Sequence, residues 1–269
     1  GLPSFGHAAF FGLGAYIIAY ISGVNDLTLS FTNNILLTLP IVIIGTGIIA
    51  LIVGSLALRT DGIYFLMITL AFAQMLFSVA MRWSAVTGGS DGLIGIPRPE
   101  INLGVWKYSF ESRTAFYYFV VTTFVAIYFG LHNITNSPFG LTLKGIKSNQ
   151  MRMQALGYKT LHYKIGIFVL AGIIAGIAGM LLAQFYWHAS PENLYWTMSG
   201  QALIMVILGG VGTLIGPVIG ATLMRLLPNI TSTYTNNWQS YMGIMLIVFI
   251  LCAPNGIMGI LLKKLKNNQ

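Results

Sequence analysis

A few polar residues and glycines interrupt the apolar stretches of this sequence, and they are its candidates for chemistry. His7 lies near the start of the first stretch, Gln74 in the middle of another, and Gln201 at the start of the longest. Uncharged polar groups and broken backbone in apolar surroundings suit contact with a passing solute better than bond-making. Each side chain could equally bond a neighbouring helix, and His7 a backbone carbonyl. The candidates are His7, Gln74, Gln201, Gly209, Gly210 and Gly212.

Motifs of enzymatic sites are missing from the sequence. The nearest match to a phosphate-binding loop, residues 140–147, has its lysine one place late and lacks the following Ser or Thr. HExxH and paired carboxylates within an apolar stretch are also missing. The single cysteine, Cys252, excludes an internal disulfide and a cysteine-built metal site. We therefore predict a protein that is not an enzyme and needs no metal or other cofactor.

The composition points to a membrane protein. The chain has 269 residues, of which 56% are hydrophobic and 7% are charged, whereas soluble domains carry about 25% charged residues. The net charge of +8 lies mostly in a few loops, so it indicates membrane topology rather than nucleic-acid binding. We predict an all-α, polytopic transmembrane helix bundle that forms a single domain over residues 1–269.

A transmembrane helix needs about 20 mainly apolar residues, and the sequence contains seven apolar runs near or above this length. The glycine-broken sixth run is the longest of them. The runs are Phe5–Ile21, Ile35–Leu58, Gly62–Met81, Ala115–Leu131, Ile165–Trp187, Gln201–Leu227 and Trp238–Cys252.

The loop charges then predict the orientation, because Lys and Arg favour the cytoplasmic side. Residues 132–164 carry five Lys or Arg and no acid, and the C-terminal tail carries three Lys. Residues 22–34 and 188–200 carry no Lys or Arg. We therefore expect loop 132–164 and the C-terminus in the cytoplasm, and the other two loops outside.

This orientation holds only if residues 201–227 enter the membrane and return to the same side. The glycines at its centre supply the break, so we predict a re-entrant pair of helices, Gln201–Leu208 and Thr213–Leu227, entering from outside. The alternative is one kinked span with an outside tail.

One loop departs from the charge rule. The segment between the third and fourth spans is placed outside, yet four basic residues lie in it or at its edges. Its length of 33 residues weakens the rule, which holds best for short loops. The four residues are Arg82, Arg98, Lys107 and Arg113.

Several motifs resemble the permease subunits of branched-chain amino acid ABC importers. The loop Thr87-Gly-Gly-Ser-Asp-Gly-Leu-Ile-Gly-Ile-Pro97 is similar to that of the M-type permease of the pair. Family members normally have one or more helices before the Gly6-His-Ala motif, so we expect this chain to be incomplete at its N-terminus. The other matching stretches are Gly6–Tyr16, Asp61–Met75, Ala155–Tyr158, Met205–Pro217 and Ala253–Gly259.

The resemblance implies a permease of the bacterial inner membrane that forms a heterodimer with a second, homologous permease. Two cytoplasmic ATP-binding subunits would power it, and a periplasmic substrate-binding protein would deliver the substrate. It also implies that loop 132–164 docks on the ATPase, and that these membrane proteins contact lipid but no nucleic acid. Asn149, Gln150 and Gln154 stand where relatives often have acids, so an ion pair with the ATPase is not implied. The coupling residues would be Arg152, Met153, Gln154, Ala155 and Gly157.

Other functions predict other features. A path without charges also suits urea or short amides, which related permeases carry. A proton- or sodium-coupled secondary carrier predicts a buried acid in a span, and none of the apolar runs contains one. A structural membrane scaffold leaves the glycine-broken run unexplained.

Overall fold

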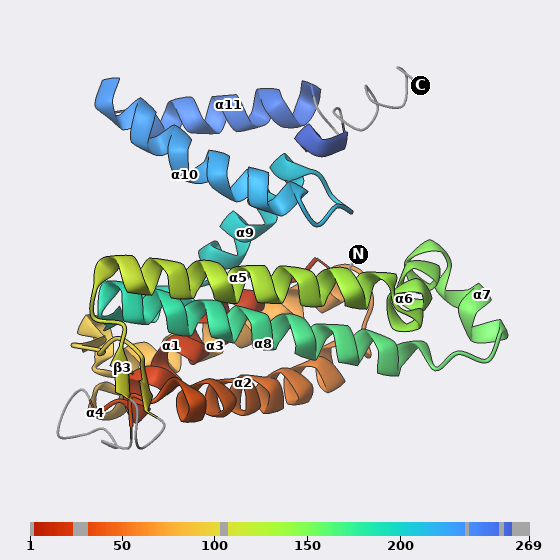
Figure 1. The fold of residues 1–269 in the computed structure, drawn as a ribbon. Coiled ribbons are helices and arrows are strands. Elements are labelled where there is room, and N and C mark those ends of the chain that lie inside the picture. The colour runs from red at the N-terminus through yellow and green to blue at the C-terminus, as the bar shows by residue number, and fades with distance from the viewer. Residues whose placement is uncertain (1–2, 24–31, 103–106, 235–236, 253–255, 260–269) are drawn as a thin grey trace. The chain divides into compact units, whose positions relative to one another are not determined.

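The computed structural model describes residues 3–23, 32–102, 107–234, 237–252 and 256–259. The chain is mainly helical, which confirms the predicted fold class. It divides into two compact units, Gly1–Ser199 and Gly200–Gln269. The prediction of one permease domain over 1–269 stays a prediction. Five long helices build the first unit (Figure 1): α1 (His7–Ile21), α2 (Ile35–Ala57), α3 (Ile63–Arg82), α5 (Arg113–Asn136) and α8 (Thr160–Tyr186).

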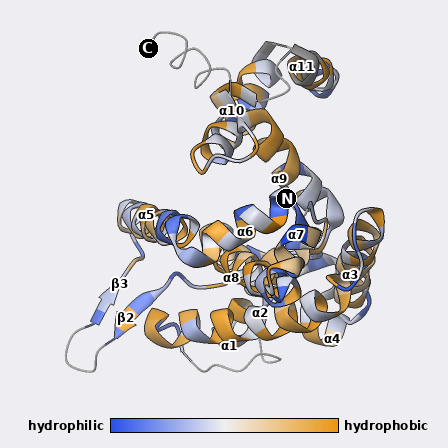
Figure 2. Ribbon diagram, turned by 90° about the vertical axis from the view of Figure 1, so that its right-hand side faces the viewer, coloured by the Kyte–Doolittle hydropathy of each residue, from blue (hydrophilic) through white to orange (hydrophobic). Residues whose placement is uncertain are grey.

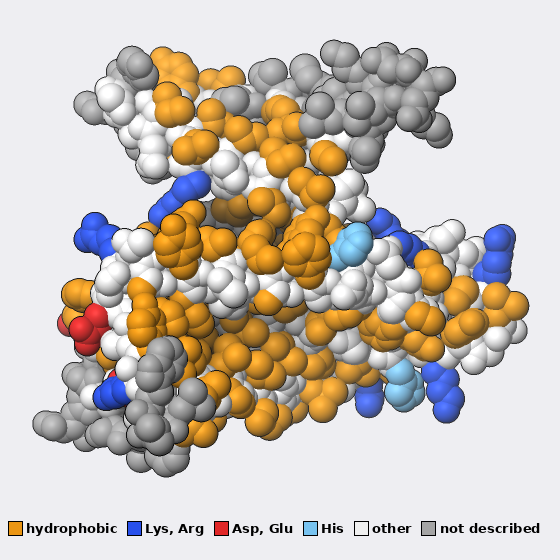
Figure 3. Space-filling model, in the orientation of Figure 1, with side chains coloured by type: hydrophobic (Ala, Val, Ile, Leu, Met, Phe, Trp, Pro, Cys, Tyr) orange, Lys and Arg blue, Asp and Glu red, His pale blue; other side chains and the backbone are white. Residues whose placement is uncertain are grey.

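Within the described residues, four helices are long and apolar enough to cross a membrane, namely α2, α3, α5 and α8. Helix α1, with 15 residues, is apolar but shorter. Large apolar side chains cover the outside of the bundle, for example Ile44 on α2 and Phe129 on α5, while Lys and Arg gather toward its two ends (Figure 3). This distribution is that of helices whose outer faces meet lipid.

Helix α8 packs against α1 and α2 through glycines. A Cβ at Gly179 would overlap the carbonyl oxygen of Phe11, and one at Gly14 would overlap that of Gly176. Small residues at these positions let the two backbones approach closely. Beside this contact, Phe10 and Phe168 meet edge to face at a centroid distance of 5.6 Å in a buried cluster.

Short elements close one end of the first unit. Strand β1 (Leu93–Ile94) pairs with β4 (His188–Ala189), and β2 (Glu100–Asn102) pairs with β3 (Lys107–Ser109), both antiparallel. Strands β2 and β3 carry mostly polar residues, in contrast to the apolar long helices (Figure 2). The remaining elements here are α4 (Ser84–Thr87) and the 3₁₀ turns η1 (Gly89–Asp91) and η2 (Pro191–Leu194).

The sixth apolar run is broken, as predicted, but at different bounds. Helix α9 spans Trp196–Gly209 and begins in the first unit, and α10 spans Gly216–Tyr234 in the second. Both outer ends lie beyond the predicted bounds, because polar residues such as Thr197 and Asn229 continue the helical hydrogen bonding past the apolar run. The second unit also contains α11 (Trp238–Cys252). Re-entry of this helix pair stays a prediction.

Candidate translocation and coupling sites

The loop between α5 and α8 folds into two short helices, α6 (Pro138–Ser148) and α7 (Gln150–Ala155), at the far end of the bundle from β3 (Figure 1). Ser137 caps α6, whose first residue is a proline, and Asn149 Oδ1 accepts a hydrogen bond of 2.9 Å from the Arg152 N–H at the start of α7. The sequence thus stops and restarts the helix within two residues. Helix α5 extends over residues 132–136 and α8 begins at residue 160, and the cytoplasmic coupling loop over residues 132–164 stays a prediction.

Gly157 ends α7 in the left-handed region, at φ +87°, and its N–H donates to the Gln154 carbonyl at 2.9 Å. A residue with a Cβ is strained at this φ, so glycine suits the position directly after the helix end. A Cβ here would meet nothing within 4 Å. The constraint at Gly157 is therefore the backbone conformation and not crowding.

Four of the five candidate coupling residues are exposed: Arg152, Gln154, Ala155 and Gly157. Met153 is half-buried, because its sulfur packs against Gly145 and holds α7 on α6. Two large apolar side chains stand out beside them, Met151 at 81% exposure and Leu156 at 67%. The exposed face of α7 is therefore an apolar patch with one positive charge. Sequence reasoning did not single out Met151, whose orientation follows only from the start of α7 at Gln150.

Side-chain bonds anchor this loop to the membrane helices. The Gln154 Nε2 donates to Thr160 Oγ1 at 3.1 Å, and Lys164 Nζ lies 2.9 Å from Asp61 Oδ1. The two bonds therefore connect α7 to α8, and α8 to the turn between α2 and α3. The Asp61–Lys164 pair was not predicted, since neither residue belongs to a motif that suggests the other.

In the first unit, the structure places His7 and Gln74 on different helices, and no side-chain hydrogen bond joins them. The half-buried His7 ring begins α1, interacts with the Ser4 backbone, and contacts the Phe10 and Phe168 rings at 6.3 and 5.9 Å. This matches the alternative in which His7 pairs with backbone. In α3, the Oε1 of Gln74 is buried and accepts no hydrogen bond from the rest of the described chain. The Gln74 Oε1 is therefore a buried acceptor without a hydrogen-bond partner among the described residues.

Ser199 is a site residue that sequence reasoning missed. Its Oγ accepts a hydrogen bond of 2.7 Å from the Ala8 N–H, and its side chain is buried. The bond satisfies an N–H in the first turn of α1, which has no other side-chain cap. The start of α9 is thereby held against the start of α1, next to His7. No sequence pattern joins residues so far apart.

In the second unit, the glycine candidates form the break between α9 and α10. Gly210 and Gly212 have φ of +123° and +96°, and a Cβ at Gly209 would overlap the Gly216 carbonyl. Thr213 stabilises the break: its hydroxyl donates to the Gly210 carbonyl and accepts from the Gly216 N–H, both at 3.1 Å. Gln201 lies outside the break and is exposed on α9. The break is thus an ordered turn.

The part of the chain that the structure describes contains no group of three or more His, Cys, Asp or Glu side chains that could hold a metal ion. The apolar helices and the glycine break offer hydrogen-bonding groups but no cluster of charges.

Residues 1–253 match the family described as "Branched-chain amino acid transport system / permease component". The chain belongs to this family. LivM of Escherichia coli (strain K12), named a high-affinity branched-chain amino acid transport system permease protein, is 24% identical over 99% of this chain and 66% of its own length. This chain therefore spans about two thirds of that relative. A probable LivM of Methanocaldococcus jannaschii is 25% identical over 96% of this chain and 85% of that protein.

The permease family also includes a second type of subunit. LivH of Escherichia coli (strain K12), also named a permease protein of the high-affinity system, is 27% identical over 52% of this chain and 46% of its own length. The match to LivM covers far more of the chain, which agrees with the M-type resemblance. No solved structure matches the chain. Family membership and several apolar helices make this a multi-pass membrane protein.

Proposed function

We propose that this chain is a transmembrane permease subunit of an ATP-binding-cassette importer for branched-chain amino acids. The observation that carries the proposal is the family match over residues 1–253, together with similarity to LivM over nearly the whole chain. Its partners would be a second, homologous permease, two cytoplasmic ATP-binding subunits and a periplasmic substrate-binding protein. The chain would lie in the bacterial inner membrane with its C-terminus in the cytoplasm, and ATP hydrolysis would take place in the partner subunits.

In this proposal, α6 and α7 form the coupling element. The exposed patch of α7 would be the apolar surface that contacts the ATPase, and Met151 and Leu156 are its largest side chains. Arg152, Gln154, Ala155 and Gly157 lie around it, and Met153 keeps α7 on α6. The closing of the ATPase pair would move α7, and the anchors at Thr160 and Lys164 would pass the movement to the membrane helices. ATP binding would then shift the permease between two access states.

The translocation path would use His7, Gln74 and Gln201 with the break at Gly209, Gly210 and Gly212. The free Oε1 of Gln74 is an acceptor for a substrate ammonium or amide group, and the apolar surroundings suit an aliphatic side chain. Because the path offers no fixed charge, we assign most of the substrate discrimination to the substrate-binding protein.

Transport by the reconstituted complex tests this function. The full-length protein, its partner permease, the ATP-binding subunits and the binding protein would be placed in proteoliposomes, and uptake of labelled leucine and labelled urea measured with and without ATP. We expect ATP-dependent leucine uptake. Uptake of urea but not leucine would mean that the substrate is urea rather than a branched-chain amino acid. Uptake of either solute without ATP would favour a secondary carrier and contradict the proposal.

The variant Gly157→Pro tests the coupling element in the same assay. Proline fixes φ near −65° and lacks the N–H, whereas this position needs φ +87° and donates to Gln154. We expect leucine uptake to fall by at least about tenfold while the permease still assembles, since a coupling free energy is typically a few kcal/mol. The control is Gly130→Ala on α5, where a Cβ would meet nothing within 4 Å. Uptake by Gly157→Pro at the control level would contradict the coupling role.

A further inference from the structure

The four basic residues that break the charge rule divide into two pairs in the structure. Lys107 forms an ion pair of 3.1 Å with Glu100. The Arg98 guanidinium lies 5.5 Å from the Phe116 ring centroid and 5.4 Å from that of Trp187, and donates to the Glu111 carbonyl. Within the described residues, Arg82 and Arg113 have no side-chain hydrogen bond or ion pair. Two cationic side chains at this end of the bundle therefore lack a hydrogen-bond or ion-pair partner among the described residues.

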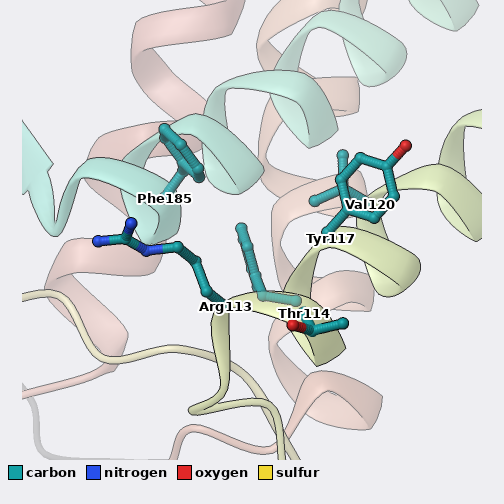
Figure 4. A pocket seen from close by; sticks show the side chains of 6 residues that line it. Arg113, Thr114, Tyr117, Val120 and Phe185 are labelled. Carbon is teal, nitrogen blue, oxygen red and sulfur yellow. The ribbon is translucent and has the colours of Figure 1, made fainter.

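Arg113 stands at the end of an apolar groove between α5 and α8. This α5–α8 groove has a volume of about 460 Å³ and is lined by Arg113, Thr114, Phe116, Tyr117, Val120 and Phe185. Figure 4 shows the Arg113 side chain extending toward Phe185, with Tyr117 and Val120 further along α5. The groove therefore joins one cationic group to an apolar trough. Arg82 lines a similar groove on α3, with Met75, Val79 and Trp83.

The length of α5 sets the depth of this groove in the membrane. Its 24 residues extend about 36 Å at 1.5 Å per residue, slightly more than a hydrocarbon core of about 30 Å. Arg113 is the first residue of α5, so it lies at headgroup level, while Tyr117 and Val120 lie one and two turns deeper. Phe116 is the only described residue of α5 that is buried, so most of the helix surface remains open.

We propose that the α5–α8 groove binds a phospholipid. The phosphate of the headgroup contacts Arg113 and the positive end of α5, and one acyl chain lies along Tyr117, Val120 and Phe185. A phosphodiester supplies the anion that Arg113 lacks, and a hydrocarbon chain matches the apolar lining. The site also accounts for a cation on the side of the membrane that the charge rule disfavours. It does not depend on which solute the protein carries.

Photolabelling tests the site. The full-length protein would be reconstituted in vesicles containing phosphatidylglycerol with a diazirine in one acyl chain, irradiated, and its adducts mapped by peptide mass spectrometry. We expect adducts to concentrate at Tyr117, Val120 and Phe185. Arg113→Gln should lower them about fivefold, the effect of one basic residue near a lipid surface. Val120→Trp, which fills the groove, should lower them further.

The matched control is Arg59→Gln, which removes the same charge from an exposed arginine at the other end of the bundle. It should leave the groove adducts unchanged. Adducts spread evenly over α5, including Phe124 and Phe129, and insensitive to Arg113→Gln would mean ordinary lipid contact and overturn the proposal. A second outcome would also overturn the proposal: no adducts form in the groove, while a cysteine at Val120 cross-links to a protein segment. The groove would then hold protein rather than lipid. Thermal unfolding of each variant shows whether it is folded.

Discussion

The ion pair between Asp61 and Lys164 joins two residues in very different surroundings. The distance is 2.9 Å, but the Lys164 side chain is 8% exposed whereas that of Asp61 is 71% exposed. Water can therefore replace the lysine as a partner of Asp61, but it has little access to the lysine ammonium. Removing Lys164 and removing Asp61 should therefore lower the free energy of unfolding by different amounts.

We expect Asp61→Ala to lower the free energy of unfolding by about 1–3 kcal/mol, because it leaves a buried ammonium without its partner. Lys164→Met should cost less, since the methionine keeps the buried volume and the exposed carboxylate is hydrated. Thermal unfolding of both variants and of the double variant in detergent measures the difference. The double variant should resemble Lys164→Met alone. Equal losses for the two single variants would show that the pair is not asymmetric.

At the residue scale, the sequence predicted positions better than partners. The family resemblance implied the coupling residues, and the break at Gly209–Gly212 came from a local signal, the glycines inside an apolar run. The contacts of Ser199 with α1 and of Lys164 with Asp61 did not, because they join segments far apart in the chain. Such pairs depend on how α8 and α9 pack, and no periodic pattern in the sequence reveals that packing.

At the scale of elements, α9 and α10 depend on a close approach of their backbones. A Cβ at Gly220 would overlap the Met205 carbonyl, just as one at Gly209 would overlap that of Gly216. The two helices are therefore in contact through glycines over more than one turn. Together with the Thr213 bonds, this contact fixes the geometry of the break.

The substitution Gly220→Ala should separate α9 from α10 and lower the free energy of unfolding by about 1–3 kcal/mol, the usual cost of overpacking. Gly243→Ala on α11 is the matched control, because a Cβ there would meet nothing within 4 Å. The control should be neutral or stabilising, since alanine favours helix over glycine. Thermal unfolding and leucine uptake would be measured for both. A loss of stability of the same size in both variants would contradict the close contact.

Hydropathy predicted the long helices well and the small strands not at all. An apolar run of membrane length forms a helix because its backbone must satisfy its own hydrogen bonds, so α2, α3 and α8 could be located from composition. The strands β1 to β4 have only two or three residues each; β1 and β4 come from different loops, whereas β2 and β3 pair within one loop. Their pairing follows from the packing of the end of the bundle and leaves no alternating pattern in the sequence.

At the scale of the whole molecule, the topology rests on the number of crossings. Loop charges predict that residues 132–164 lie inside and 188–200 outside, and the break between α9 and α10 would let the chain return to the outside before α11. Within the described residues, four helices are long and apolar enough to cross a membrane, whereas α9 has only 14 residues, about 21 Å. A helix of this length does not cross a hydrocarbon core of about 30 Å by itself. A single kinked span would therefore need α9 and α10 to cross together, whereas re-entry needs each to reach only part of the way.

Cysteine labelling distinguishes the two topologies. After Cys252→Ser, single cysteines would be placed at the exposed Glu192, at the exposed Ser148 of α6, and at Asn268 in the C-terminal tail. With a membrane-impermeant maleimide in intact spheroplasts, we expect Glu192→Cys to react. Ser148→Cys and Asn268→Cys should react only after permeabilisation. Reaction of Asn268→Cys in intact spheroplasts, with Ser148→Cys still protected, would mean that α9 and α10 together cross once. The tail would then lie outside, and the lysines at its end would contradict the charge rule that places every other short loop.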